Sequence, residues 1–152
     1  MFLVQDSSSE RQIRIKKISD EDPILSLILA VIHFEWTIRR AIISLGTSPN
    51  ISIRSKLDGC HGLKAYKDLW KQEVSAKSSK KTLPDVVKNW EKLGKAFQLR
   101  NKLVHGVSSA GSVYARERTT WALEAANYVS LFCHEHGIDL DARLRVRRSV
   151  KS

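Results

Sequence analysis

The sequence predicts an all-α fold, an antiparallel bundle of about four to five helices. Long stretches of the 152-residue chain carry apolar residues at every third or fourth position, the spacing of a helix that buries one face. No stretch shows the sustained alternation of a half-buried strand, and only three prolines and seven glycines interrupt the chain. Short loops between the periodic stretches favour antiparallel neighbours.

The first strongly periodic segment covers residues 22–45. Asp22 can cap the first turn, and Pro23 is favoured at the first helical position. Apolar residues cover much of the circumference, so we expect a central helix that is buried on several sides. Gly46 marks its end and residues 47–50 form a loop.

Three further segments have helical periodicity, and the first of them contains a break near Gly59 or Gly62. They cover residues 51–77, 84–105 and 113–136. The Lys- and Ser-rich residues 75–82 predict a mobile linker.

We expect one domain over residues 22–140. A polar lead-in precedes it at residues 1–21, where Ser7 to Glu10 could start a short helix. A basic tail follows at residues 141–152, which could bind RNA phosphates, remain a solvated end or dock a protein.

The composition suits a packed domain with an anionic partner. Hydrophobic residues make up 42%, enough to bury a core, and the net charge is +10 with a pI near 9.9. Nucleic acid, an acidic protein and an anionic membrane all fit this charge. The charge therefore predicts a class of partner and no chemistry.

The cysteines and the N-terminus predict a cytoplasmic protein. Cys60 and Cys133 are too few for a disulfide scaffold, and the chain start lacks the basic and apolar regions of a signal peptide. The most apolar run, residues 24–34, has 11 residues, short of a membrane span. Cys133 and His136 share a helix face, but a zinc site needs more ligands, so no metal or other cofactor is expected.

One segment interrupts the apolar stripe of the helix predicted over residues 84–105. Beyond Phe97, the next stripe positions are Arg100 and Asn101, and Val104 resumes the pattern. Burying a guanidinium or an amide costs free energy unless the group is paired. These two residues therefore need partners or a function.

His105 completes a group of residues that suits metal-free RNA cleavage. It lies four residues after Asn101, on nearly the same helix face, and the Arg100 side chain is long enough to reach that face. The histidine can act as general acid or base, the arginine can stabilise charge on a phosphate, and the asparagine can orient either group. The RNA 2′-hydroxyl would supply the nucleophile, so DNA should resist cleavage.

The segment from Arg100 to Gly106, RNKLVHG, resembles the signature of HEPN (higher eukaryotes and prokaryotes nucleotide-binding) domains. The resemblance covers about residues 22–140. It implies an all-α fold and a metal-independent endoribonuclease of a toxin–antitoxin, phage-defence or RNA-processing system. It also implies a homodimer in which Arg100, Asn101 and His105 face their copies, with RNA as substrate and an antitoxin or defence protein as a further partner. Some HEPN proteins have lost catalysis and only bind.

Glu35 is a further candidate site residue. It could form an ion pair with Arg39 one turn along the same helix. Alternatively, if this helix packs beside the motif, Glu35 could orient Arg100 or His105. His33, in an apolar run, is expected to be a core residue with its hydrogen bonds satisfied.

Three alternatives to an RNA-cutting site stay open. His105 could simply cap its helix, where a cation is favourable, and Arg100 and Asn101 could form a structural network in a dimer. The whole chain could be a helical module that binds RNA, a nucleotide or a protein without catalysis. It could also be a dimerisation domain of a larger complex.

Overall fold

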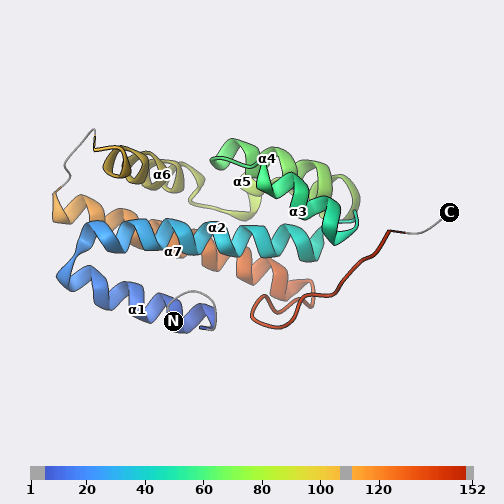
Figure 1. Ribbon diagram of the computed structural model, residues 1–152, viewed down its shortest axis with the longest axis horizontal. Coiled ribbons are helices and arrows are strands. Elements are labelled where there is room, and N and C mark those ends of the chain that lie inside the picture. Colours follow the sequence, from blue (N-terminus) through green and yellow to red (C-terminus); the bar gives the residue numbers. More distant parts are fainter. Residues whose placement is uncertain (1–5, 107–110, 150–152) are drawn as a thin grey trace. The chain divides into compact units, whose positions relative to one another are not determined.

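The computed structural model describes residues 6–106 and 111–149, without the side chains of residues 77–79. Within these ranges every regular element is a helix, which confirms the all-α prediction (Figure 1). The chain divides into two compact units. Unit 1 comprises Met1–Trp36 and Asn89–Asn127, and unit 2 comprises Thr37–Lys88 and Tyr128–Ser152.

Unit 1 is a bundle of four helical segments. It contains α1 (Ser8–Glu21), α6 (Trp90–Val104) and the first parts of α2 (Pro23–Leu45) and α7 (Ser112–Glu135). Both α1 and α6 run antiparallel to α2 (Figure 1). The core is apolar and includes Ile15, Leu27, Ala30, Val31, Phe34, Leu93, Ala96, Phe97, Ala115 and Ala122.

The lead-in expected at residues 1–21 contains a well-formed helix, α1. Ser7 Oγ accepts the backbone N–H of Glu10, and the Glu10 carboxylate accepts the N–H of Ser7. This reciprocal cap satisfies two donors that the first turn would otherwise leave unpaired. Arg11 and Ile15 then bury one face of the helix.

The buried arginine of α1 is held by His33 and Trp36. Arg11 Nε donates to His33 Nδ1 over 3.1 Å, and the guanidinium carbon lies 3.8 Å from the centre of the Trp36 ring. Burial, aided by the charge of Arg11, lowers the pKa of His33 to about 4. The imidazole is therefore neutral and can accept a hydrogen bond. The predicted core position of His33 is confirmed, and its Nδ1 accepts a hydrogen bond there.

The helices of unit 2 begin after the loop that follows α2. They are α3 (Asn50–Asp58), α4 (Leu63–Trp70), the π-helix η1 (Lys71–Ser79) and α5 (Leu83–Val86), joined in unit 2 by the last parts of α2 and α7. The break expected near Gly59 or Gly62 is confirmed. The linker expected from residue 75 is wrong in part, because η1 continues α4 to Ser79. Lys80, with φ of 56°, ends it.

The single helix expected over residues 84–105 is two helices, α5 and α6. Thr82 and Asp85 form a capping box that starts α5. Val87 is extended and fully buried, so the chain leaves the helix to bury two consecutive valines. Asn89 then donates its amide to the carbonyl of Trp121 (3.0 Å) just before α6.

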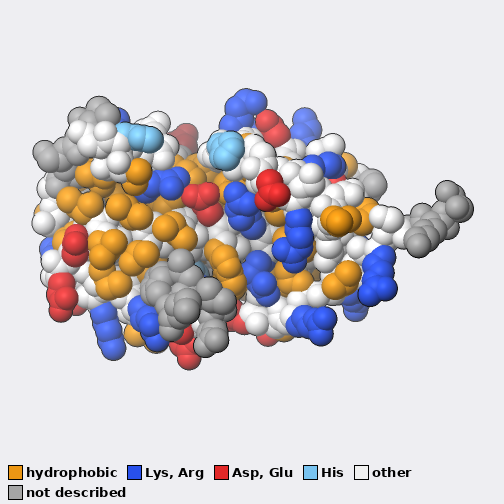
Figure 2. All heavy atoms as spheres, in the orientation of Figure 1, with side chains coloured by type: hydrophobic (Ala, Val, Ile, Leu, Met, Phe, Trp, Pro, Cys, Tyr) orange, Lys and Arg blue, Asp and Glu red, His pale blue; other side chains and the backbone are white. Residues whose placement is uncertain are grey.

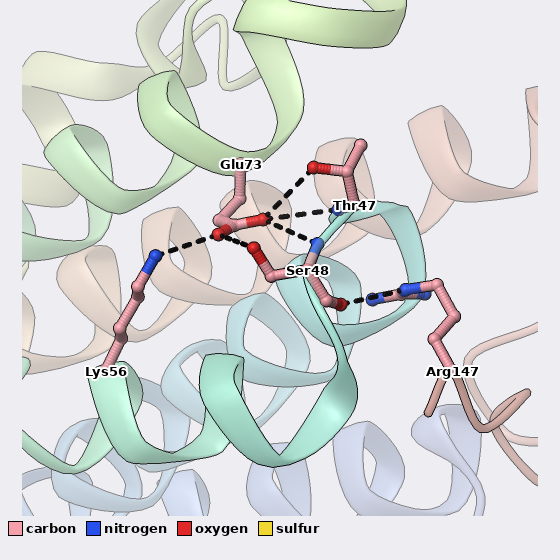
Figure 3. A network of polar contacts seen from close by, with 5 residues as sticks. All are labelled: Thr47, Ser48, Lys56, Glu73 and Arg147. Atoms are coloured by element: carbon pink, nitrogen blue, oxygen red, sulfur yellow. Dashed lines mark hydrogen bonds and ion pairs between the residues drawn. The ribbon is translucent and has the colours of Figure 1, made fainter. Parts of the chain in front are cut away.

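A buried carboxylate fastens the end of α2 to the helices of unit 2. Figure 3 shows Glu73 accepting hydrogen bonds from the backbone N–H groups of Thr47 and Ser48, from the hydroxyls of both, and from Lys56 Nζ. Burial alone would raise the pKa of the Glu73 carboxyl, but these hydrogen bonds outweigh it and lower the pKa to about 2. The neighbouring Gly46 has no room for a side chain, because a Cβ would lie 2.6 Å from the backbone carbonyl oxygen of Ile42.

Part of the expected basic tail is held against the end of α2, within unit 2. The Arg147 guanidinium donates to the carbonyls of Ile43, Ser44 and Ser48, near the C-terminal end of α2 (Figure 3 draws its contact with Ser48). Asn50 pairs with the backbone of Arg145 and Arg147. Arginine side chains suit such a helix end because it carries unpaired carbonyls and partial negative charge.

Candidate functional site at the end of helix α6

Helix α6 carries the candidate site at its C-terminal end. Leu93, Ala96 and Phe97 are buried, and the Phe97 ring meets Phe34 of α2 edge to face at 5.9 Å between centroids. This packing fixes the rotation of α6 within unit 1. The residues that follow Phe97 are therefore held in a defined orientation toward α2.

Arg100 contacts Glu35 across the α2–α6 interface. Its Nη2 lies 3.2 Å from Glu35 Oε1, and the two side chains are 21% and 22% exposed. The guanidinium carbon also lies 5.4 Å from the centre of the Phe97 ring. The Nε atom is buried and has no hydrogen-bond partner among the described residues. The cation is thus held on two sides, with part of its donor capacity unused.

Asn101 and His105 lie on the exposed surface of the last turn of α6. The His105 backbone N–H donates to the Asn101 carbonyl over 3.1 Å, so the imidazole is carried by the residue that caps the helix. Gly106 follows with φ of 67°, a left-handed conformation that suits glycine. In the described part of the chain, neither the Asn101 nor the His105 side chain has a hydrogen-bond partner. Both are available to a ligand.

Exposed apolar residues lie near the end of α6 and at the start of α7. Val104 on α6 is 56% exposed, and Val113 and Tyr114 at the start of α7 are 74% and 61% exposed. On the face shown in Figure 2, apolar side chains gather over the part of unit 1 formed by α2 and α6. The apolar stripe of α6 thus runs out of the core and onto the surface at Val104.

The structure brings together some of the predicted site residues. Arg100 and Glu35 are in contact, as expected if α2 packs beside the motif, while Arg39 Nε donates to the Tyr66 hydroxyl (3.0 Å). Asn101 and His105 lie on the exposed face of α6, one turn apart. The contact of Arg100 with Phe97 was not anticipated, although their three-residue spacing on a helix could have revealed it.

The other candidate groups have structural surroundings. Cys133 is fully buried, and burial raises the pKa of its thiol to about 12. His136 Nδ1 lies 2.8 Å from the Phe132 carbonyl. Within residues 6–106 and 111–149, no three His, Cys, Asp or Glu side chains are placed to hold a metal ion. In the same ranges, no helix is both long and apolar enough to cross a membrane.

Comparisons with protein-family models, with curated proteins and with solved structures found no match for this chain. A functional assignment must therefore come from the residues themselves. The end of α6 places a guanidinium, an amide and an imidazole within six consecutive residues. Such a set can bind a phosphate group and exchange protons with it.

Proposed function

We propose that this protein is a metal-independent endoribonuclease of the HEPN type that acts as a homodimer. One observation carries the proposal: exposed Asn101 and His105 lie at the end of α6, next to a guanidinium held by Glu35. The resemblance of the RNKLVHG sequence of that segment to the HEPN signature supports the same assignment.

His105 would move the protons of the reaction. In RNA cleavage the ribose 2′-hydroxyl attacks the adjacent phosphorus, the bond to the 5′-oxygen breaks, and a 2′,3′-cyclic phosphate forms. A neutral imidazole can take the proton of the 2′-hydroxyl, and an imidazolium can give one to the departing 5′-oxygen. The surface position of His105 lets an RNA strand reach it.

Arg100 would stabilise the charge that builds on the phosphate. One terminal nitrogen pairs with Glu35, and a guanidinium has five N–H donors, so others remain for a phosphate oxygen. Glu35 would act as a positioning residue that holds the Arg100 guanidinium in place. Asn101, one turn before His105, would hydrogen-bond the phosphate or orient the imidazole.

A dimer would supply the second proton-transfer group. The attacking and leaving oxygens lie on opposite sides of the phosphorus, so one imidazole is poorly placed to serve both. A two-fold axis beside α6 would bring a second His105 to the same phosphate. The exposed Val104, Val113 and Tyr114 support such a contact, because a partner would remove their apolar surface from water.

We place this activity in a toxin–antitoxin or phage-defence system. An RNA-cutting enzyme that needs no cofactor must be restrained in the cell that makes it. The net charge of +10 suits both the RNA substrate and an acidic inhibitor protein.

A second function has an observation in its favour. The Arg100 cation is already paired with Glu35 and is only 21% exposed, as expected of a group that stabilises the bundle. The end of α6 would then be a non-catalytic surface that binds RNA, a nucleotide or a protein. Loss of cleavage without loss of binding distinguishes the two functions.

The test compares three proteins on a mixed RNA pool in EDTA. They are the wild type, His105→Ala, and a control, His134→Ala, that removes another exposed histidine, near the end of α7. We expect wild type and the control to cut RNA and His105→Ala to lose about 10²–10⁴-fold in rate. RNA binding without cleavage by all three proteins would support the non-catalytic module.

A further inference from the structure

The C-terminal segment of unit 2 forms one wall of a cavity of about 580 Å³. Arg40 on α2 holds the start of this wall, with hydrogen bonds of 2.7 and 2.8 Å to the carbonyls of Leu140 and Ala142. Asn50 and the Arg147 guanidinium hold its end. The residues between these fixed points are therefore kept beside the end of α2.

The charged lining of this cavity is mostly positive. Arg143, Arg145 and Arg147 line it, and Asp139 is the one carboxylate among the described residues that do. Arg147 is already bound to backbone carbonyls, so it forms part of the wall. The side chains of Arg143 and Arg145 are exposed and have no hydrogen-bonding acceptor among the described residues. Their two charged forks are available to a ligand.

Two further groups offer hydrogen bonds to the same cavity. Ser44 Oγ is buried, lines the cavity and has no partner in the described part of the chain. A buried hydroxyl without a partner costs free energy, and a ligand oxygen in the cavity would remove this cost. The His136 ring is fixed by its contact with the Phe132 carbonyl and by packing on the Phe132 ring at 4.3 Å, which leaves Nε2 for a ligand.

We propose that this cavity binds a phosphomonoester, the terminal phosphate of a nucleotide or of an RNA end. Arginine forks match phosphate oxygens in geometry and charge. A terminal phosphate offers three free oxygens and up to two negative charges, whereas a phosphate within a chain offers two oxygens and one charge. The cavity has the volume of a small-molecule site, which favours a terminal group. The proposal is independent of RNA cleavage, since none of these residues belongs to the α6 site.

The test measures binding by titration calorimetry on the full chain carrying His105→Ala, so that RNA remains intact. The probes are a nucleoside 5′-monophosphate, its nucleoside, and one short oligoribonucleotide with and without a 5′-phosphate. We expect each phosphorylated probe that binds to do so about tenfold tighter than its unphosphorylated counterpart. If only the monophosphate binds, the cavity is a site for free nucleotides. If the 5′-phosphorylated oligoribonucleotide binds as well, the cavity also accepts RNA ends.

Variants tie the binding to the cavity. Arg143→Gln with Arg145→Gln should weaken phosphate binding about tenfold or more, and Ser44→Ala about threefold with an unchanged melting temperature. The matched control, Lys71→Gln with Arg148→Gln, removes the same charge from exposed positions outside the cavity and should change affinity less than about twofold. The proposal is overturned if no phosphorylated probe binds, if the 5′-phosphate makes no difference, or if both double variants weaken binding equally.

Discussion

The Glu73 network and the end of α6 use polar groups in opposite ways. Glu73 is 2% exposed, and its carboxylate accepts hydrogen bonds from Thr47, Ser48 and Lys56. At the end of α6, Asn101 and His105 are exposed without partners among the described residues, and Arg100 is only partly satisfied. A polar group that is fully paired contributes to the fold, whereas one that keeps free capacity can act on a ligand. Substitutions in the two regions should therefore separate stability from activity.

The largest expected effect is on stability, at Glu73. Glu73→Gln removes the charge that the Ser48 and Lys56 donors stabilise, so we expect the free energy of unfolding to fall by about 3–4 kcal/mol. Urea unfolding followed by circular dichroism measures this change. Glu91→Gln, at an exposed position of α6, is the control and should change stability by less than about 0.5 kcal/mol. An effect of Glu73→Gln as small as that of the control would contradict a structural role.

Arg100→Ala should act mainly on the rate of RNA cleavage. We expect a loss of about 10²-fold, because the phosphate loses its guanidinium, and a stability loss of about 1 kcal/mol because the ion pair between Arg100 and Glu35 is lost. Arg100→Lys keeps the charge without the fork and should restore the rate only in part. Cleavage rates at saturating RNA, with unfolding curves of the same preparations, check both parts. If Arg100→Ala destabilises the protein but the folded fraction still cleaves RNA at the wild-type rate, Arg100 has a structural role and no role in cleavage.

The pH dependence of stability should reveal the buried groups of both units in different ranges. His33 has a folded pKa of about 4, below the ordinary value of 6.5, so the unfolded chain takes up its proton first. Stability is therefore complete above pH 6.5 and falls as the pH drops toward 4, by about 2 kcal/mol at pH 5. Glu73 has a folded pKa of about 2, so its contribution to stability is lost only as the pH falls below about 4.5. Urea unfolding between pH 7 and pH 3 measures both losses of stability. The His33→Gln variant should remove the pH dependence above about pH 4.5 and leave the loss below that pH unchanged.

The smallest expected effect is that of Asn101→Ala. An exposed amide with no partner in the described structure should contribute less than about 0.5 kcal/mol to stability. Its loss should slow cleavage about tenfold, the equivalent of one neutral hydrogen bond to the reacting phosphate. Parallel measurement of melting temperature and cleavage rate checks this separation. An unchanged cleavage rate would remove Asn101 from the site.

Local signals in the sequence predicted much of the fold. Asp22, Pro23 and Gly46 correctly located the ends of α2, and the glycines after α3 located its break. Helix α1 was underrated because a charged residue, Arg11, occupies a core position and weakens the apolar stripe. The break between α5 and α6 depends on the burial of Val87, which spacing along the chain does not encode.

The candidate site was easier to locate than the structural network. Arg100 and Asn101 were conspicuous because they interrupt an apolar stripe, and that signal is local. Glu73 meets Thr47 and Ser48 across a separation of about 25 residues, so no helical spacing connects them. The pairing of Glu35 with Arg100 likewise depends on the packing of α2 on α6. From the sequence, an ion pair of Glu35 with Arg39 was an equally open alternative.

The chemistry of the cut ends tests the central claim most directly. Wild-type protein is incubated with RNA in EDTA, and the new 3′ ends are analysed for a 2′,3′-cyclic phosphate. Attack by the 2′-hydroxyl with proton transfer through His105 predicts cyclic phosphate ends, and no such ends with His105→Ala. Cuts that leave 3′-hydroxyl ends, or cyclic ends that persist undiminished in the His105→Ala protein, would contradict the assignment of the α6 site.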